Sequence, residues 1–139
     1  THMPDCSIST DIIVGFPGET DDEFRETLEI VNKVRFDFAY MFKYSSRPGT
    51  KASQYSDQVS EEDKQKRLEM LIDVQKKNTL LRNQKYIVKT IDVLNEKNSK
   101  RSDTQWSGRT EGNKWVVFDK NDYLSYPRNL KKDLLLELV

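Results

Sequence analysis

A short glycine-containing turn is the first feature of this sequence that could support chemistry. It consists of four consecutive residues, Gly15, Phe16, Pro17 and Gly18. The turn follows an apolar run at residues 8–14, and ligands bind at the carboxyl ends of strands in α/β folds, where a glycine lets them approach the backbone. A structural interpretation is also open, and the residues alone favour it: Pro17 and Gly18 set backbone angles, and Glu19 favours the positive N-terminus of a following helix.

A second turn places an arginine where it could contact a ligand. Residues 45–50 read Ser-Ser-Arg-Pro-Gly-Thr and close an aromatic-rich run at residues 36–44. The guanidinium of Arg47 is a planar cation suited to such a contact, and an exposed turn arginine without any ligand also fits the residues. The sequence alone leaves both interpretations open.

Basic and aromatic residues gather further along the chain. Across residues 76–101 only Asp92 and Glu96 are acidic, whereas eight residues are basic: Lys76, Lys77, Arg82, Lys85, Lys89, Lys97, Lys100 and Arg101. Such a local excess of basic residues can bind the phosphates of a nucleic acid. Trp106, Trp115 and Tyr123 could stack on unpaired bases. We expect Trp115, in its apolar run, to belong to the core, while Trp106 suits either role.

The composition restricts other kinds of site. The 139 residues contain 23 Lys and Arg and 23 Asp and Glu, so the net charge gives no sign of nucleic-acid binding. The single cysteine, Cys6, and the single histidine, His2, cannot build a disulfide framework or a four-ligand metal site by themselves. Cys6 is interpreted as a bystander or a core residue. No long apolar run or secretion signal occurs, so we expect a cytoplasmic protein without a membrane span.

The elements that must position these residues alternate between strand and helix. Residues 8–14 predict a buried strand, and Thr20, Asp21, Asp22 and Glu23 form a capping box that begins a helix of about four turns. Residues 36–44 predict a second strand, and Ser60 precedes a helix that should reach about residue 84. Its expected stripe contains Leu68, Leu71, Ile72 and Gln75 and is widened by Met70, Val74, Leu80 and Leu81. This order predicts a parallel α/β arrangement, with too few units to close a barrel.

After residue 85 the pattern changes to short runs. Residues 86–94, 104–110, 115–118 and 134–139 predict strands, and residues 111–113 predict a turn. We therefore expect an α/β part at residues 1–84 and an all-β part, a small barrel, at residues 85–139.

The two turns carry a resemblance to a known family. The run Asp-Ile-Ile-Val-Gly-Phe-Pro-Gly-Glu-Thr at residues 11–20 is similar to the stretch that follows the fifth barrel strand of radical-SAM methylthiotransferases. Residues 44–50 are similar to the family's Tyr-Ser-Pro-Arg-Pro-Gly-Thr motif, with Ser46 in place of the first proline. The resemblance implies the last two βα units of that barrel. It also implies an S-adenosylmethionine site that contains Gly15, Phe16, Pro17, Gly18 and Arg47. Glu19 is either a neighbour of the cofactor or a helix cap.

The part after residue 85 resembles a TRAM domain, the small β-barrel that these enzymes append for RNA binding. The similar segments are Ser-Gly-Arg-Thr at residues 107–110 and Asn-Lys-Trp-Val-Val-Phe at residues 113–118. The resemblance and the local charge together assign RNA contacts to seven residues: Lys97, Lys100, Arg101, Trp106, Arg109, Asn113 and Lys114. Residues 133–139 match an interior strand of that barrel, so we expect the barrel to be incomplete.

The Arg-Pro-Gly form of the second turn resembles the branch of the family that acts on tRNA isopentenyladenosine, the MiaB type. It implies a parent enzyme that adds a methylthio group to N6-isopentenyladenosine beside the anticodon, using S-adenosylmethionine and two [4Fe-4S] clusters. The cluster cysteines cannot come from this chain, so we expect this fragment to bind no cofactor and to be inactive alone.

The expected partner is a tRNA anticodon stem-loop, and the unpaired edge of the strand at residues 8–14 predicts self-association. Three alternatives stay open. One is a non-catalytic RNA-binding module, and the other two are methylthiotransferases that act on threonylcarbamoyl-adenosine or on a ribosomal protein.

Overall fold

The structure is a computed structural model that describes residues 6–87, 89 and 91–120. The chain divides into two compact units, and each is described by itself here. One unit is Ile8–Arg82, and the other combines residues 1–7 with Asn83–Val139. None of the helices in the described part of the chain has the length and apolar character that a membrane crossing requires.

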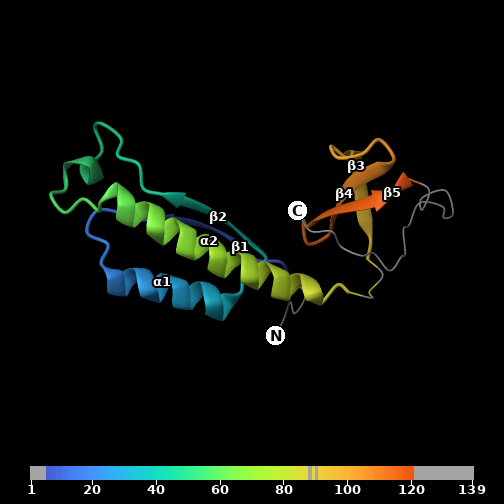
Figure 1. The fold of residues 1–139 in the computed structure, drawn as a ribbon, viewed down its shortest axis with the longest axis horizontal. Coiled ribbons are helices and arrows are strands. Elements are labelled where there is room, and N and C mark those ends of the chain that lie inside the picture. Colours follow the sequence, from blue (N-terminus) through green and yellow to red (C-terminus); the bar gives the residue numbers. More distant parts are fainter. Residues whose placement is uncertain (1–5, 88, 90, 121–139) are drawn as a thin grey trace. The chain divides into compact units, whose positions relative to one another are not determined.

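The first unit contains a pair of parallel strands with two helices, as the alternation of strand and helix predicts. The elements follow in the order β1 (Ser9–Val14), α1 (Asp21–Val34), β2 (Phe38–Lys43), the short 3-10 helix η1 (Lys51–Gln54) and α2 (Glu61–Gln84) (Figure 1). β1 and β2 pair in parallel, from Ser9 opposite Phe38 to Val14 opposite Lys43. Their carboxyl ends therefore lie at one edge of the sheet.

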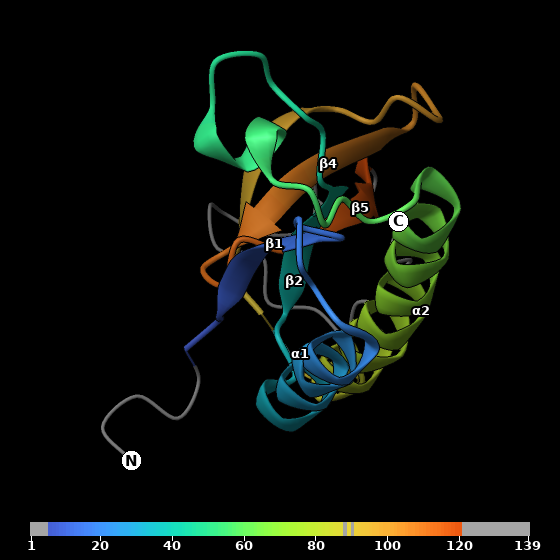
Figure 2. The same cartoon turned by 90° about the vertical axis from the view of Figure 1, so that its left-hand side faces the viewer.

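Both helices cover one face of this strand pair. Val14, Phe24, Val31 and Leu71 form the buried centre, and further apolar side chains from both strands and both helices pack around it. Figure 2 looks along the helices and shows α1 and α2 on the same side of the strands. The opposite face of the sheet exposes Ile13, Tyr40 and Phe42, because side chains alternate along a strand.

The start of α1 confirms the predicted capping box. The Thr20 hydroxyl accepts a hydrogen bond from the Glu23 backbone N–H, and the Glu23 carboxylate accepts one from the Thr20 N–H. The helix ends where Arg35 adopts a left-handed conformation and its N–H donates to the Val31 carbonyl at 3.0 Å.

α2 also begins as predicted, because the Ser60 hydroxyl accepts from the Asp63 N–H at 3.0 Å. Its buried stripe is narrower than the sequence pattern indicated. Met70, Leu80 and Leu81 are 44%, 59% and 50% exposed, so they do not widen the stripe, whereas Val74 packs against the core as expected. Two amides complete the buried face instead: Gln75 donates to the Phe36 carbonyl at 2.9 Å, and Asn78 donates to the Val31 carbonyl at 3.1 Å. Val31 lies in the last turn of α1, where its carbonyl also accepts from the Arg35 N–H, and Phe36 lies between α1 and β2. The two amides therefore tie α2 to the end of α1 and to the segment that follows it.

The second unit contains a three-stranded antiparallel sheet in the order β3 (Val93–Asn98), β4 (Gln105–Thr110) and β5 (Trp115–Asp119). The expected strands at residues 104–110 and 115–118 are confirmed to within one residue. The expected strand at 86–94 is misplaced, because Tyr86 and Ile87 continue from α2 in turns and the strand begins only at Val93. Tyr123 and the expected strand at 134–139 lie outside the described residues.

One face of this sheet carries its core. Val116 and Phe118 are buried, and Ile91, Val93 and Trp106 pack against them. The predicted turn after β4 is present: Asn113 has φ 59, and its N–H donates to the Thr110 carbonyl at 2.9 Å. This left-handed conformation suits asparagine better than most residues.

Candidate functional site

A groove lies at the carboxyl ends of β1 and β2 and has a volume of about 610 Å³. Its apolar lining comes mainly from Ile13, Phe16 and Phe42, and Arg47 and Thr50 contribute polar groups. The structure thus brings Phe16 from the first turn and Arg47 from the second turn to one groove. Their meeting follows from the parallel pairing, which the Tyr44 N–H extends by donating to the Val14 carbonyl at 2.8 Å.

Tyr44 is the most enclosed residue of the groove. It is 9% exposed, and its ring meets the Phe16 ring edge to face, with 5.2 Å between the ring centroids. The Lys64 ammonium lies 5.3 Å from the centre of the Tyr44 ring. Within the described part of the chain, the buried Tyr44 hydroxyl has no hydrogen-bond partner. A buried hydroxyl in this state can donate to or accept from a bound ligand without first breaking another bond.

The two glycines of the first turn are explained by packing. Gly15 and Gly18 have φ values of 70 and 85, which favour glycine. A Cβ on Gly15 would overlap Cγ of Lys64, and a Cβ on Gly18 would lie 2.6 Å from a carboxylate oxygen of Asp57. Side chains of this chain therefore occupy the space beside these glycines. Neither glycine lines the groove, and nor does the buried Pro17; these residues shape the turn that carries Phe16.

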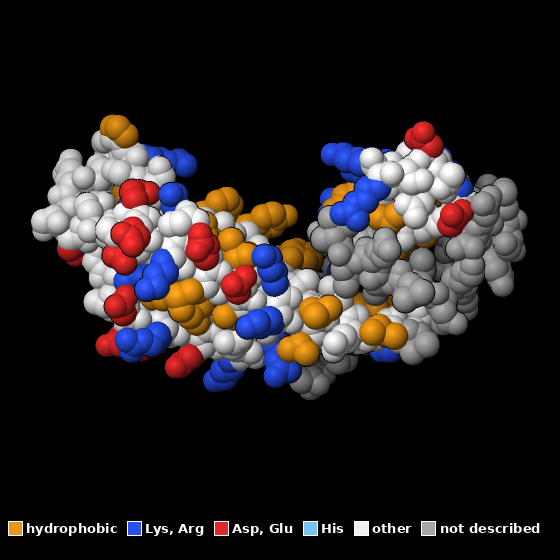
Figure 3. Space-filling view, viewed as in Figure 1, with side chains coloured by type: hydrophobic (Ala, Val, Ile, Leu, Met, Phe, Trp, Pro, Cys, Tyr) orange, Lys and Arg blue, Asp and Glu red, His pale blue; other side chains and the backbone are white. Residues whose placement is uncertain are grey.

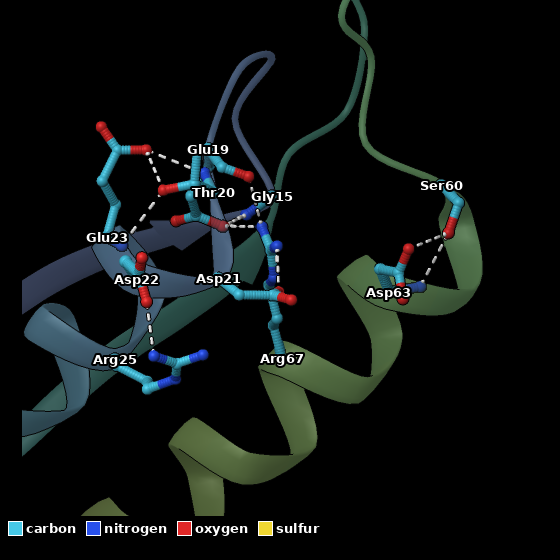
Figure 4. Close-up of polar contacts among 10 residues, drawn as sticks. All are labelled: Gly15, Glu19, Thr20, Asp21, Asp22, Glu23, Arg25, Ser60, Asp63 and Arg67. Carbon is cyan, nitrogen blue, oxygen red and sulfur yellow. Dashed lines mark hydrogen bonds and ion pairs between the residues drawn. The ribbon is translucent and has the colours of Figure 1, made fainter.

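Glu19 ties the first turn to α2 (Figure 4). Its carboxylate oxygen Oε2 accepts from the Gly15 N–H at 2.6 Å and from Nη1 of Arg67, also at 2.6 Å. Arg67 Nη1 also donates to the Glu19 carbonyl at 2.9 Å, and Arg67 Nη2 donates to Asp21 at 2.8 Å. Glu19 is therefore not the helix cap, because Thr20 has that role. It is a largely buried acceptor that closes the turn.

The charges around Arg67 alter several pKa values. Burial alone would favour the neutral guanidine, but hydrogen bonds to Asp21 and Glu19 outweigh burial and raise the pKa of Arg67. The hydrogen bond from Arg67 and its charge lower the pKa of Asp21. Hydrogen bonds from the Thr20 backbone and then from its hydroxyl lower the pKa of Glu23. These contacts therefore favour the charged forms of Asp21 and Glu23 at the start of α1.

The predicted RNA residues fall into two groups on the β3–β5 sheet. In the first group Lys97 and Arg109 lie over the ring of Trp115, and Asn113 contacts Arg109. The Lys97 ammonium lies 4.5 Å from the ring centre and the Arg109 guanidinium 4.3 Å from it. Arg109 Nε lies 3.3 Å from a carboxylate oxygen of Glu96, and Nη1 donates to the Asn113 side chain. Lys100 and Arg101 are exposed in the loop that follows β3.

The two tryptophans lie on opposite faces of the sheet, and only Trp115 is placed against expectation, because Trp106 suited either role. Trp106 packs on Phe118 in the core, with ring centroids 6.2 Å apart. Trp115 was expected in the core, but it is half-buried on the other face of the sheet, beside the two cations. The reason is register: Val116 and Phe118 of β5 face the core, so Trp115, Val117 and Asp119 cannot.

Three other residues named from the sequence are Lys114, Arg82 and Cys6. The first two contact side chains of this chain, and the third is exposed. Lys114 is 5% exposed, and its ammonium lies 5.8 Å from the centre of the Tyr86 ring. Arg82 forms an ion pair with the buried carboxylate of Asp37 at 2.8 Å. Cys6 is exposed, so it is not a core residue. Among the described residues, no group of three or more His, Cys, Asp or Glu side chains could hold a metal ion.

No protein-family model matches the chain. Curated proteins do match it, and three of them share the name tRNA-2-methylthio-N(6)-dimethylallyladenosine synthase. The protein of Parabacteroides distasonis is 49% identical over 122 residues, which is 87% of this chain and 27% of the relative. The protein of Christiangramia forsetii is 44% identical over 122 residues, or 87% of this chain and 25% of the relative. That of Acetivibrio thermocellus is 48% identical over 118 residues, or 85% and 25%. The chain is homologous to a segment of these synthases.

This homology confirms the resemblance that the two turn motifs indicated. Dimethylallyl is another name for the isopentenyl group. The name of these relatives therefore agrees with the branch of the family that the Arg-Pro-Gly form around Arg47 resembles. The chain spans about a quarter of the length of the synthases it matches.

Sequence reasoning missed the residues that hold the candidate site together. Arg67 and Lys64 are ordinary charged residues of an amphipathic helix in the sequence, and nothing local marks them. The available signal was their spacing of three residues, which places both on one helix face toward the turn. The unpartnered hydroxyl of Tyr44 has no sequence signal at all.

Proposed function

We propose that the chain is a segment of a radical-SAM methylthiotransferase that adds a methylthio group to N6-isopentenyladenosine in tRNA, next to the anticodon. One observation carries this proposal: relatives at 44% and 49% identity over 87% of the chain bear the same name, which specifies the 2-methylthio product and the dimethylallyl adenosine. We take tRNA, through its anticodon stem-loop, as the partner and the cytoplasm as the location.

In this proposal β1, α1, β2 and α2 are the last two βα units of the enzyme's barrel. The parallel pairing of β1 and β2 supports this assignment. The exposed apolar side chains of Ile13, Tyr40 and Phe42 support it as well, because barrel strands are covered on both faces. The β3–β5 sheet is assigned to a TRAM-like barrel, and the domains to residues 1–84 and 85–139. The division of the chain after Arg82 supports that boundary.

The lining of the groove suits two parts of S-adenosylmethionine, its nucleobase and its carboxylate. Phe16, Ile13 and Phe42 offer flat apolar surface for a nucleobase, and the Tyr44 hydroxyl is a buried polar group without a partner. Arg47 could hold the carboxylate of the methionine portion. When bound, S-adenosylmethionine would supply the chemistry by which a C–H bond of the adenosine is replaced. Gly15, Pro17 and Gly18 would act indirectly, by fixing the position of Phe16.

The described residues do not fit an iron–sulfur cluster. Such a cluster takes three or four thiolates, and Cys6 is the single cysteine of the sequence. We therefore assign no step of the reaction to a cluster held by this chain, and we expect the 139 residues alone to be inactive.

The test is to express the whole gene from which the chain comes and to analyse the nucleosides of tRNA by mass spectrometry. Cells that lack the endogenous synthase should gain 2-methylthio-N6-isopentenyladenosine when the whole gene is present and not when only the 139 residues are. A gene product without three closely spaced cysteines, or one that leaves isopentenyladenosine unmodified, would contradict the proposal and favour a non-catalytic RNA-binding protein. A methylthio group on threonylcarbamoyl-adenosine or on a ribosomal protein would point to another branch.

A further inference from the structure

The outer face of the β3–β5 sheet carries a row of side chains from three strands. Lys97 lies on β3, Arg109 on β4 and Trp115 on β5. Arg109 and Trp115 are direct cross-strand partners, and Lys97 is paired with Ser107, two residues before Arg109 on the same face of β4. A bulge between Asn95 and Lys97 sets this register, because it shifts the pairing of β3 by one residue. The cluster is therefore built by the sheet itself.

The Trp115 ring holds two positive charges close together. Both cations lie within 4.5 Å of its centre, where the negative face of the ring attracts them and offsets their mutual repulsion. Arg109 is further fixed by Glu96 and Asn113. In the described part of the chain Lys97 has no carboxylate within 4.0 Å, so its charge is not neutralised by an ion pair there.

The surroundings extend this charge. Lys100 and Arg101 are exposed in the loop after β3, and none of the described ion pairs involves them. Figure 3 shows lysine and arginine side chains projecting from this unit with hydrophobic side chains beside them. A site of this composition suits a ligand that combines a negative charge with a flat ring.

An unpaired nucleotide has both groups, whereas an acidic peptide has only the charge. The phosphate would bind Lys97 and Arg109, and the base would stack on Trp115, whose ring an unpaired base can reach and a base in a duplex cannot. Lys97 is exposed and flexible, so it can leave the ring for the phosphate. Trp106 cannot serve in this way because it packs in the core.

We infer that Trp115, with Lys97 and Arg109, forms a binding site for an unpaired nucleotide of single-stranded RNA. The inference rests on the proposed function, in which the protein acts on tRNA, and it adds the residue that stacks on the base.

The experiment titrates the 139-residue chain with a fluorescently labelled anticodon stem-loop RNA, with a fully paired RNA of equal length, and with heparin. A Trp106→Phe background leaves Trp115 as the single tryptophan, so its fluorescence reports the contact directly. We expect the stem-loop to quench Trp115 and Trp115→Leu to weaken binding about tenfold, while Trp115→Phe keeps most of the affinity. Lys97→Gln should lower the slope of log affinity against log salt by roughly one. Lys33→Gln, an exposed lysine of α1, is the matched control.

The circular dichroism of each variant shows whether it is folded. Folded Trp115→Leu and Lys97→Gln variants that bind the stem-loop like the unaltered chain would overturn the inference. Equal binding of the paired RNA, displacement by heparin without any change in Trp115 fluorescence, or no RNA binding at low salt would overturn it too. The proposed enzymatic function would stand in each of these cases, because nucleoside analysis with the whole gene tests it separately.

Discussion

Arg67 shows how a single side chain can fix a turn that lies 48 residues earlier in the chain. Its guanidinium binds both the carbonyl and the carboxylate of Glu19, and the same carboxylate oxygen accepts the Gly15 N–H. The side chains of Arg67 and Glu19 are 9% and 12% exposed, so water screens their attraction little. The position of Phe16 in the groove therefore depends on α2.

Replacing Arg67 with methionine should destabilise the first unit by roughly 2–4 kcal/mol, because the buried Glu19 carboxylate would lose its partner. Hydrogen exchange should also speed up at the Gly15 N–H. Urea unfolding followed by circular dichroism measures the first effect, and exchange mass spectrometry measures the second. Arg25→Met removes an exposed ion pair to Asp22 and should cost under about 0.5 kcal/mol. Equal losses in the two variants would show that Arg67 has no special role.

Gly15 and Gly49 have similar backbone angles, with φ 70 and 84, but different surroundings. A Cβ at Gly15 would meet Lys64, whereas a Cβ at Gly49 would meet nothing within 4 Å. Gly49→Ala should lower the free energy of unfolding by about 1 kcal/mol, because alanine is strained in the left-handed conformation. Gly15→Ala should cost that amount plus roughly 1–3 kcal/mol for the overlap. Urea midpoints of the two variants test this order, and a smaller loss at Gly15 than at Gly49 would contradict it.

For single residues, the sequence predicts the surroundings of a side chain only where the neighbouring residues in the sequence determine them. Phe16 and Arg47 were assigned to one site through the family resemblance, and the structure brings them to one groove because parallel strands end at the same edge of the sheet. Arg67 could not, because its partner is remote in sequence. Trp115 was assigned to the wrong face because an apolar run of four residues, 115–118, does not show which of its alternating positions faces inward.

The elements were more predictable than the residues, because each begins or ends with recognisable chemistry. Thr20 and Ser60 cap the two helices, and hydrogen bonds to their hydroxyls confirm both starts. β3 was misplaced because Tyr86 and Ile87 are residues typical of strands, while the structure uses them to end α2 in turns. Tertiary context overrides propensity there.

The helix starts also predict a dependence on pH. Hydrogen bonds from Thr20 lower the pKa of Glu23, and the hydrogen bond from Lys64, followed by that from Lys43, lowers the pKa of Glu61. A carboxylate whose pKa is lower in the folded state stabilises the fold above its unfolded pKa and loses this effect as pH falls through the folded value. The urea midpoint should therefore drop as pH falls below about 5.

The Glu23→Gln variant should be less stable than the unaltered chain at neutral pH and should lose less stability on acidification. The two should converge only as pH falls through the lowered folded-state pKa of Glu23, where the carboxylate becomes protonated. Glu29→Gln, an exposed position within the same helix, should follow the unaltered chain at every pH. Parallel pH profiles for Glu23→Gln and the unaltered chain would show that the capping carboxylate does not contribute.

For the molecule as a whole, the sequence indicated the order of its two parts, but it could not show which surfaces stay open. The first unit contains a sheet of two strands, so β1 and β2 each have one edge without a partner among the described residues. The face away from the helices exposes Ile13, Tyr40 and Phe42. Unpaired edges beside exposed apolar side chains favour pairing with another chain.

We therefore expect the 139-residue chain to self-associate through this face as its concentration rises. Light scattering after size-exclusion chromatography should show a mass that grows with concentration. Tyr40→Lys should return the chain toward a monomer, because Tyr40 is 61% exposed on this face and a charge there disfavours strand pairing. Ile30→Lys is the matched control, since Ile30 is 57% exposed but lies on α1. A strict monomer at high concentration, or equal effects of the two lysines, would show that this sheet face does not drive association.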